Sequence, residues 1–284
     1  MNSDIQKLAN NFIYDGHLRC GSLKVANKRI KYKVDPATVI IEKWPFSLPR
    51  ADSSSKLGIP WVASALDPQH GAVFIDTDLI PGHESRIEGS DLVQNDIEVK
   101  IIKVLTSVLL ECGIEGRQIG ILSPYPASAA YEQQLQSERK KHRAGIEIHT
   151  IDRYQGRDAD VIILSLVRSN SSQAIGELLR DWHRINVAIT RARYKLIVVG
   201  SQSTLVRSPL FAGMLKSLND SNSVVKIPKN APIPATITET ASANAAALSA
   251  GATSDAGSQG RGTTKMAGSA LLKKLPITSN IIAE

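Results

Sequence analysis

The chain has 284 residues, of which 42% are hydrophobic and 21% are charged, a composition that is ordinary for a globular protein. Its 34 basic and 27 acidic residues give a net charge of +7, which permits a polyanionic partner such as nucleic acid without establishing one. No apolar run approaches the about 20 residues needed to cross a bilayer, so we expect no membrane partner.

The cysteines and the first residues indicate the compartment. Cys20 and Cys112 form neither a disulfide framework nor a metal-ligand spacing, and we expect buried, reduced thiols. Residues 1–7 contain neither the basic nor the apolar region of a signal peptide. An intracellular, reducing compartment is therefore predicted.

Residues 1–70 predict one helix followed by irregular structure. Ser3 and Asp4 are typical of a helix start, apolar residues then recur at helical spacing, and Asp15 with Gly16 predicts the end. Pro36, Pro45, Pro49 and Pro60 follow, together with three serines at 53–55. The range 31–69 is therefore expected to be an irregular surface excursion of a larger lobe.

From residue 71 the sequence alternates between strand and helix patterns. Strands are predicted at 72–76, 119–123, 146–150, 161–167 and 195–200. Helices are predicted from Asn95 to Gly113, at about 127–140, at about 175–193 and finally up to about Leu218. Asn95 followed by Glu98 is a capping-box-like helix start. This alternation predicts an α/β fold over 71–220, a parallel sheet with helices on both faces.

The composition changes after about Pro228 to alanine, serine, threonine and glycine. Such a segment cannot bury enough apolar surface to fold by itself. We therefore expect 221–284 to be a linker and a disordered carboxyl-terminal tail, with a short docking helix over 266–275 as the alternative for its end.

Residues 150–158, Thr-Ile-Asp-Arg-Tyr-Gln-Gly-Arg-Asp, follow a predicted strand at a turn. Ligands in parallel sheets bind beside the carboxyl ends of strands, so the position favours a ligand role. Gly156 lets the backbone approach a phosphate or ribose, Asp158 can accept a hydrogen bond from a ribose hydroxyl, and Gln155 can bridge nucleotide and nucleic acid. The alternative is a solvated turn that needs glycine for its geometry.

Two arginines close the segment 184–193, Arg-Ile-Asn-Val-Ala-Ile-Thr-Arg-Ala-Arg. The Arg191 guanidinium can hold two oxygens of a γ-phosphate while negative charge spreads onto them. Arg193 can hold nucleic-acid backbone or a neighbouring carboxylate. For both residues the alternative is a solvated basic helix end that the helix dipole favours.

Tyr125 follows the strand predicted at 119–123. Its ring can stack on a base of nucleic acid. A tyrosine packed in the core or at its rim is an equally good interpretation.

Together these segments resemble the last two motifs of a superfamily-one helicase motor. Ser169-Asn170, the run 176–193 beginning Gly-Glu-Leu-Leu-Arg-Asp-Trp, and 195–200 resemble more closely the carboxyl-terminal motor domain of the eukaryotic DNA replication nuclease–helicase family. That family processes Okazaki-fragment flaps and resected ends. The resemblance covers roughly residues 1–218, and residues 74–78 fit it too. It implies a RecA-like second helicase lobe.

The resemblance also implies roles for single residues. The implied nucleotide contacts are Gln155, Gly156, Asp158 and Arg191, with Arg191 as a catalytic arginine finger. The implied nucleic-acid contacts are Thr150, Tyr125 and Arg193. The chain departs from the family pattern at Pro126, where arginine is usual, at Ser128, where glutamine is usual, and at Arg193, where lysine is usual.

Other family motifs do not occur in the chain. There is no Gly-x-x-x-x-Gly-Lys-Ser/Thr loop, no Asp-Glu-Ala metal motif and no cysteine cluster of an iron–sulfur nuclease domain. ATP and Mg²⁺ are therefore expected as cofactors of a longer enzyme whose Mg²⁺ ligands lie outside this chain, and an iron–sulfur cluster only in a nuclease domain outside it. Residues 1–3 match the end of the motif Gln-Tyr-Arg-Met-Asn, which predicts a fragment.

We therefore expect the second motor lobe of an ATP-dependent DNA nuclease–helicase that acts on single-stranded DNA and flaps in replication and repair, without ATPase activity as an isolated chain. The expected partners are single-stranded DNA, the first motor lobe, the nuclease domain, and single-strand-binding and replication proteins; the resemblance implies a nuclear location. Two alternatives are a non-catalytic nucleic-acid-binding or scaffold module and an RNA helicase of the same superfamily. The run 176–182 argues against the RNA helicase.

Overall fold

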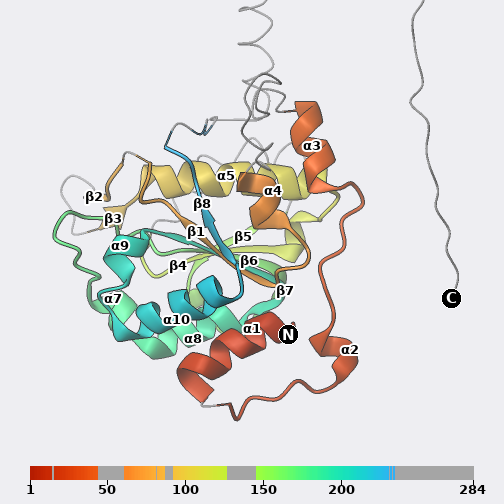
Figure 1. Cartoon of the computed structure of the whole chain (residues 1–284), viewed down its shortest axis with the longest axis horizontal. Helices are drawn as coiled ribbons and strands as arrows, with labels where there is room; N and C mark the ends of the chain where they lie inside the picture. The colour runs from red at the N-terminus through yellow and green to blue at the C-terminus, as the bar shows by residue number, and fades with distance from the viewer. Residues whose placement is uncertain are drawn as a thin grey trace, which may run out of the picture. The chain divides into compact units, whose positions relative to one another are not determined.

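A computed structural model describes residues 1–14, 16–43, 61–80, 82–86, 92–126, 145–229, 231 and 233. Six strands within them form one sheet in the order β5-β4-β6-β7-β1-β8, and every adjacent pair is parallel (Figure 1). Their bounds are Ala72–Asp76 (β1), Ile119–Ser123 (β4), Glu147–Thr150 (β5), Ala159–Ser165 (β6), Ala192–Gly200 (β7) and Val224–Lys226 (β8). A separate antiparallel pair joins β2, Ser85–Arg86, to β3, Val93–Gln94.

Helices lie on both sides of the sheet (Figure 1). On one side are α3 (Pro36–Lys43), α4 (Trp61–Leu66) and α5 (Asp96–Glu111), and on the other are α1 (Ser3–Ala9), α8 (Trp182–Thr190) and α10 (Pro209–Asp220). The shorter elements are η1 (Asn10–Tyr14), α2 (Leu23–Ala26), η3 (Gly116–Gln118), η4 (Asp152–Tyr154), α7 (Glu177–Arg180) and α9 (Gln202–Leu205). The predicted α/β fold, a parallel sheet covered on both faces, is confirmed.

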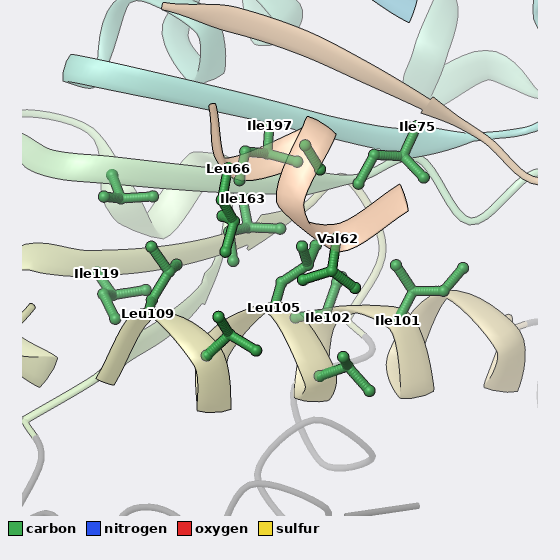
Figure 2. Close-up of a cluster of buried hydrophobic side chains, with 14 of the residues drawn as sticks. Val62, Leu66, Ile75, Ile101, Ile102, Leu105, Leu109, Ile119, Ile163 and Ile197 are labelled. Atoms are coloured by element: carbon green, nitrogen blue, oxygen red, sulfur yellow. The ribbon is translucent and has the colours of Figure 1, made fainter. Parts of the chain in front are cut away.

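The long helix α5 builds the core on its side of the sheet. One stripe of α5, including Ile101, Ile102, Leu105 and Leu109, faces strand residues Ile75, Ile119, Ile163 and Ile197 (Figure 2). Val62 and Leu66 of α4 complete this cluster. Because side chains on both faces of the central strands are buried, these strands are almost continuously apolar in sequence.

Leu105 tests how much this core contributes to stability. Its side chain is fully buried. Replacing it by alanine is expected to lower the free energy of unfolding by about 2–5 kcal/mol, because apolar contacts are lost and a cavity remains. Chemical denaturation followed by circular dichroism measures the change. Leu23→Ala is the matched control, because Leu23 is 82% exposed; equal losses in both variants would contradict the assignment of this core.

The prediction of an irregular excursion over 31–69 is wrong for its described parts. Helices α3 and α4 form there and bury Val39, Ile40 and Trp61. Proline breaks a helix interior, which is why the segment was predicted to be irregular. Proline is nevertheless favourable at the first helical position, which Pro36 occupies. Residues 44–60, and the helix predicted at 127–140, lie outside the described residues.

The helix predicted at 175–193 is divided and ends early. Asp181 leaves the helical conformation after α7 and caps α8 by accepting a hydrogen bond from the His183 amide. Arg191 caps the carboxyl end of α8, and Arg193 lies in β7. Strand β8 was not predicted, since three residues are too few for an alternation pattern.

Candidate nucleotide and nucleic-acid site

Arg191 and Asp158 meet at the amino edge of the sheet. Asp158 directly precedes β6 and Arg191 directly precedes β7. The first residues of these strands, Ala159 and Ala192, are partners in the sheet register, which brings the two preceding side chains together. Arg191 Nη1 lies 3.1 Å from Asp158 Oδ1. Two residues that the sequence proposed separately for one ligand thus form an ion pair.

Further hydrogen bonds fix the Arg191 guanidinium. Its Nε donates to the Val187 carbonyl at 3.2 Å, Nη1 to the Arg157 carbonyl at 3.4 Å and Nη2 to the Thr190 hydroxyl at 3.2 Å. The Arg191 side chain is 24% exposed and that of Asp158 is 44% exposed. An ion pair this exposed adds at most about 1 kcal/mol to stability. Its main effect is to hold a partly open guanidinium in one place.

Gly156 lies in the turn that leads to Asp158. Its φ is +83°, in the region that favours glycine, and apart from its two chain neighbours no atom of the described residues lies within 4 Å of the place where a Cβ would be. Glycine is therefore required by the backbone conformation, while the space beside it stays open to a ligand. Tyr154, the last residue of η4, is almost completely buried and precedes the turn. Gln155 between them is exposed.

The topological argument for this segment needs correction. Thr150 ends β5 beside Ser123, at the carboxyl edge of the sheet as expected. Asp158, by contrast, lies at the amino edge, since it directly precedes β6. Residues 151–158 return the chain from one edge to the other, because each parallel strand must start at the same edge. The ion pair is thus not at the carboxyl ends of the strands.

A groove of about 260 Å³ runs beside this return segment. Its walls are Ile151, Asp152, Gln155, Asp181, His183, Arg184 and Val187. Arg184 Nε lies 3.2 Å from Asp152 Oδ1 and ties α8 to the segment that follows Thr150. Gln155 and Ile151, the residue that follows Thr150, thus both line this groove.

Tyr125 is part of the core. Its side chain packs with Val93 and Val167 and the residue is 8% exposed. Its hydroxyl donates to the Ile175 carbonyl at 3.5 Å and lies 3.2 Å from Arg168 Nη1, which donates to it. A ring covered in this way offers no open face to a base, so the structure favours the core interpretation.

Arg193 also differs from its expected setting. It lies on a strand, so the interpretation as a helix end is wrong. Its Nη1 is 3.8 Å from Asp160 Oδ1, which agrees with the alternative of a neighbouring carboxylate. The side chain is 55% exposed and remains accessible.

Glu84 is the centre of a polar cluster beyond the end of β6 that the sequence patterns did not predict. Glu84 accepts hydrogen bonds from Arg168 Nε at 2.8 Å, from the Ser169 amide at 2.8 Å and from Asn170 Nδ2 at 3.0 Å. Burial by itself would raise the pKa of Glu84, but these hydrogen bonds hold the pKa below its ordinary value. Ser169-Asn170 was the sequence signal, and the structure shows that this dipeptide fixes the loop after β6.

The donors at the amino edge suit phosphate oxygens. A partly open guanidinium and an uncovered backbone at Gly156 can both meet an anionic group. No group of three or more side chains suited to a metal ion occurs among the described residues. In the same part of the chain, no helix has the length and apolar character to cross a membrane.

Comparison with known proteins identifies the family to which the chain belongs. Residues 1–203 match the family described as AAA domain. The DNA replication ATP-dependent helicase/nuclease dna2 of Schizosaccharomyces pombe is 40% identical over 230 residues, which cover 81% of this chain and 15% of that protein. Human DNA replication ATP-dependent helicase/nuclease DNA2 is 37% identical over 232 residues, 80% of this chain and 20% of that protein.

A plant relative is similar to the chain to nearly the same extent. The DNA replication ATP-dependent helicase/nuclease JHS1 of Arabidopsis thaliana is 36% identical over 225 residues, 78% of this chain and 15% of that protein. The chain thus spans a fifth or less of the length of these three relatives. It belongs to the AAA domain family, and the predicted kinship with the DNA replication nuclease–helicase family is confirmed.

Proposed function

We propose that this chain is the second motor lobe of an ATP-dependent DNA helicase/nuclease and forms one wall of its ATP-binding cleft. The observation that carries the proposal is the Arg191 guanidinium, which Asp158 and three further acceptors hold partly open at the sheet edge. The three relatives are all named DNA replication ATP-dependent helicase/nucleases, which supports the choice of activity.

Arg191 is the catalytic residue of this wall. When the γ-phosphoryl group leaves, negative charge spreads over its oxygens, and a guanidinium can bind two of them at once. Asp158 keeps the guanidinium in place before nucleotide arrives, which lowers the conformational cost of forming that contact. Mg²⁺, held by ligands outside this chain, supplies charge neutralisation at the β- and γ-phosphates when bound.

The groove beside residues 151–155 gives a route from nucleotide to nucleic acid. Gln155 and Ile151 both line it, and Thr150 directly precedes Ile151. Thr150 contacts the backbone of single-stranded DNA, and closure of two lobes around ATP moves that contact along the strand. The substrates are single-stranded DNA and flaps in replication and repair, in the nucleus. The partners are a first motor lobe, a nuclease domain carrying an iron–sulfur cluster, and single-strand-binding proteins.

An antibody against residues 16–28, most of which are exposed and none of which belongs to the candidate site, makes the test, because it captures the protein at its natural length from its own cells. The captured protein is expected to hydrolyse ATP when single-stranded DNA is added, and this chain purified alone is expected not to. Turnover by the chain alone would overturn the assignment as one wall of a shared cleft. A captured protein without turnover would instead indicate a non-catalytic binding module, and stronger stimulation by RNA would indicate an RNA helicase.

A further inference from the structure

A second groove, of about 580 Å³, lies where α8 and α10 begin. Its lining residues are Ile13, Gln173, Ala174, Ile175, Arg180, Trp182, Arg207, Ser208, Pro209 and Leu210. None of them lines the groove beside residues 151–155. Its volume is within the range of about 300–1,000 Å³ that is usual for small-ligand sites.

Trp182 forms an aromatic wall of this groove. It is the first residue of α8 and is 45% exposed. Such exposure leaves a large apolar ring in contact with solvent, whereas tryptophan rings are usually mostly buried. Its ring stacks on that of His183 with centroids 3.6 Å apart and an interplanar angle of 26°. Asp181 holds the His183 ring through Nδ1 at 3.2 Å. Trp182 is therefore an exposed aromatic surface supported from behind.

The charged residues of the groove are both arginines. Arg207 Nε donates to Gln173 Oε1 at 2.6 Å, and Arg207 makes no ion pair with a carboxylate within the described part of the chain. Arg180 pairs with Glu177, but both side chains are more than 60% exposed, so solvent weakens that pair. No carboxylate lines the groove. Its charge is thus complementary to an anion.

Two segments that line the groove follow strands that end at the sheet edge where Thr150 lies. Residues 173–175 follow the carboxyl end of β6, and 207–210 follow the carboxyl end of β7 through α9. Thr150 ends β5 at the same edge. An aromatic platform beside two guanidinium groups matches one unpaired nucleotide, whose base stacks while its phosphate pairs with arginine.

We propose that the Trp182 groove binds an unpaired base of single-stranded nucleic acid, with Arg207 on the adjacent phosphate. This site is separate from the ATP cleft and from Thr150. The proposal does not require Arg191 or hydrolysis, and binding is measured without ATP. Its failure is therefore distinguishable from failure of the proposed motor function.

Fluorescence anisotropy with a labelled thymidine oligonucleotide tests the site on the full chain. Trp182→Ala is expected to weaken binding by about 5- to 150-fold, the range that loss of one base–aromatic stack gives, and Trp182→Phe is expected to retain most of the affinity. Arg207→Ala should weaken binding and reduce the slope of log affinity against log salt concentration by about 1, the value expected for one lost phosphate contact. Arg117→Ala is the matched control, since Arg117 is 79% exposed and lies outside the groove.

An oligonucleotide of the same length without bases separates stacking from charge. Trp182→Ala should bind it as tightly as the unchanged chain, because there is no base to stack. Circular dichroism confirms that each variant is folded. Unchanged affinity of folded Trp182→Ala for the thymidine oligonucleotide would overturn the proposal and point to another protein segment as the occupant. Equal competition by duplex DNA would also overturn it.

Discussion

Replacing Arg191 by alanine in the protein at its natural length is expected to lower kcat for ATP hydrolysis by about 10³- to 10⁵-fold. The guanidinium is lost at the point where charge develops on the γ-phosphoryl group, and no other described arginine makes the same contacts with Asp158 and the end of α8. The affinity for single-stranded DNA should not change, because Thr150 lies at the opposite sheet edge. Steady-state ATPase kinetics and anisotropy measure the two effects.

The ion pair adds a second expectation to this experiment. Asp158→Asn keeps the size of the side chain but removes the charge that holds Arg191, so kcat should fall by less than in Arg191→Ala. Arg157→Ala is the control: Arg157 is adjacent in sequence, is 52% exposed and pairs with Glu147 instead. Undiminished ATP turnover in Arg191→Ala, or an equal loss in Arg157→Ala, would refute the arginine-finger role.

Replacing Glu98 by glutamine is expected to raise the free energy of unfolding at pH 8 by about 1–3 kcal/mol. Glu98 is completely buried in the first turn of α5, where Oε2 accepts hydrogen bonds from Ser165 Oγ at 2.5 Å and from the Val167 amide at 3.0 Å. Its other oxygen, Oε1, has no hydrogen-bond partner among the residues that the structure describes. Burial raises the pKa of this carboxyl to about 7, so at pH 8 folding must keep a charge in the core.

The sign of the pH dependence follows from this raised pKa. Below about pH 4.5 Glu98 is protonated in both states, and its contribution to stability is fully present. As the pH rises to about 7, the unfolded chain loses the proton first, so the free energy of unfolding falls, by about 3 kcal/mol at most. Denaturation at pH 5, 6 and 7 should show this slope in the unchanged chain and a much smaller one in Glu98→Gln.

Two comparisons isolate the effect of Glu98. Glu177→Gln is the matched control, because the Glu177 side chain is 83% exposed. Lys195 is fully buried, and burial lowers its pKa from 10.5 to about 7. Its contribution to the free energy of unfolding therefore falls as the pH drops from about 10.5 to 7, and it changes little between pH 5 and 7. An unchanged slope between pH 5 and 7 in Glu98→Gln would show that Glu98 does not titrate there.

Apolar runs of strand length located four of the six strands that the structure describes in the sheet, and the alternating pattern over 146–150 located a fifth, β5. Val161 to Leu164 are buried on both faces, and such a run has few other stable conformations in a domain of this size. Asn95 located the start of α5 correctly, because its side chain accepts from the Ile97 and Glu98 amides as an N-cap should. The capping-box interpretation was wrong for Glu98, whose carboxylate extends to the end of β6.

For the candidate site, the sequence determined which residue types were present but not their partners. Local patterns identified Gly156, since a turn with positive φ requires glycine, and placed Arg191 at a helix end. The pairing of Arg191 with Asp158 depends on the register of β6 on β7, which joins distant parts of the chain. Only the tertiary structure decided that pairing and the burial of Tyr125, because both depend on which strands are neighbours and not on local sequence.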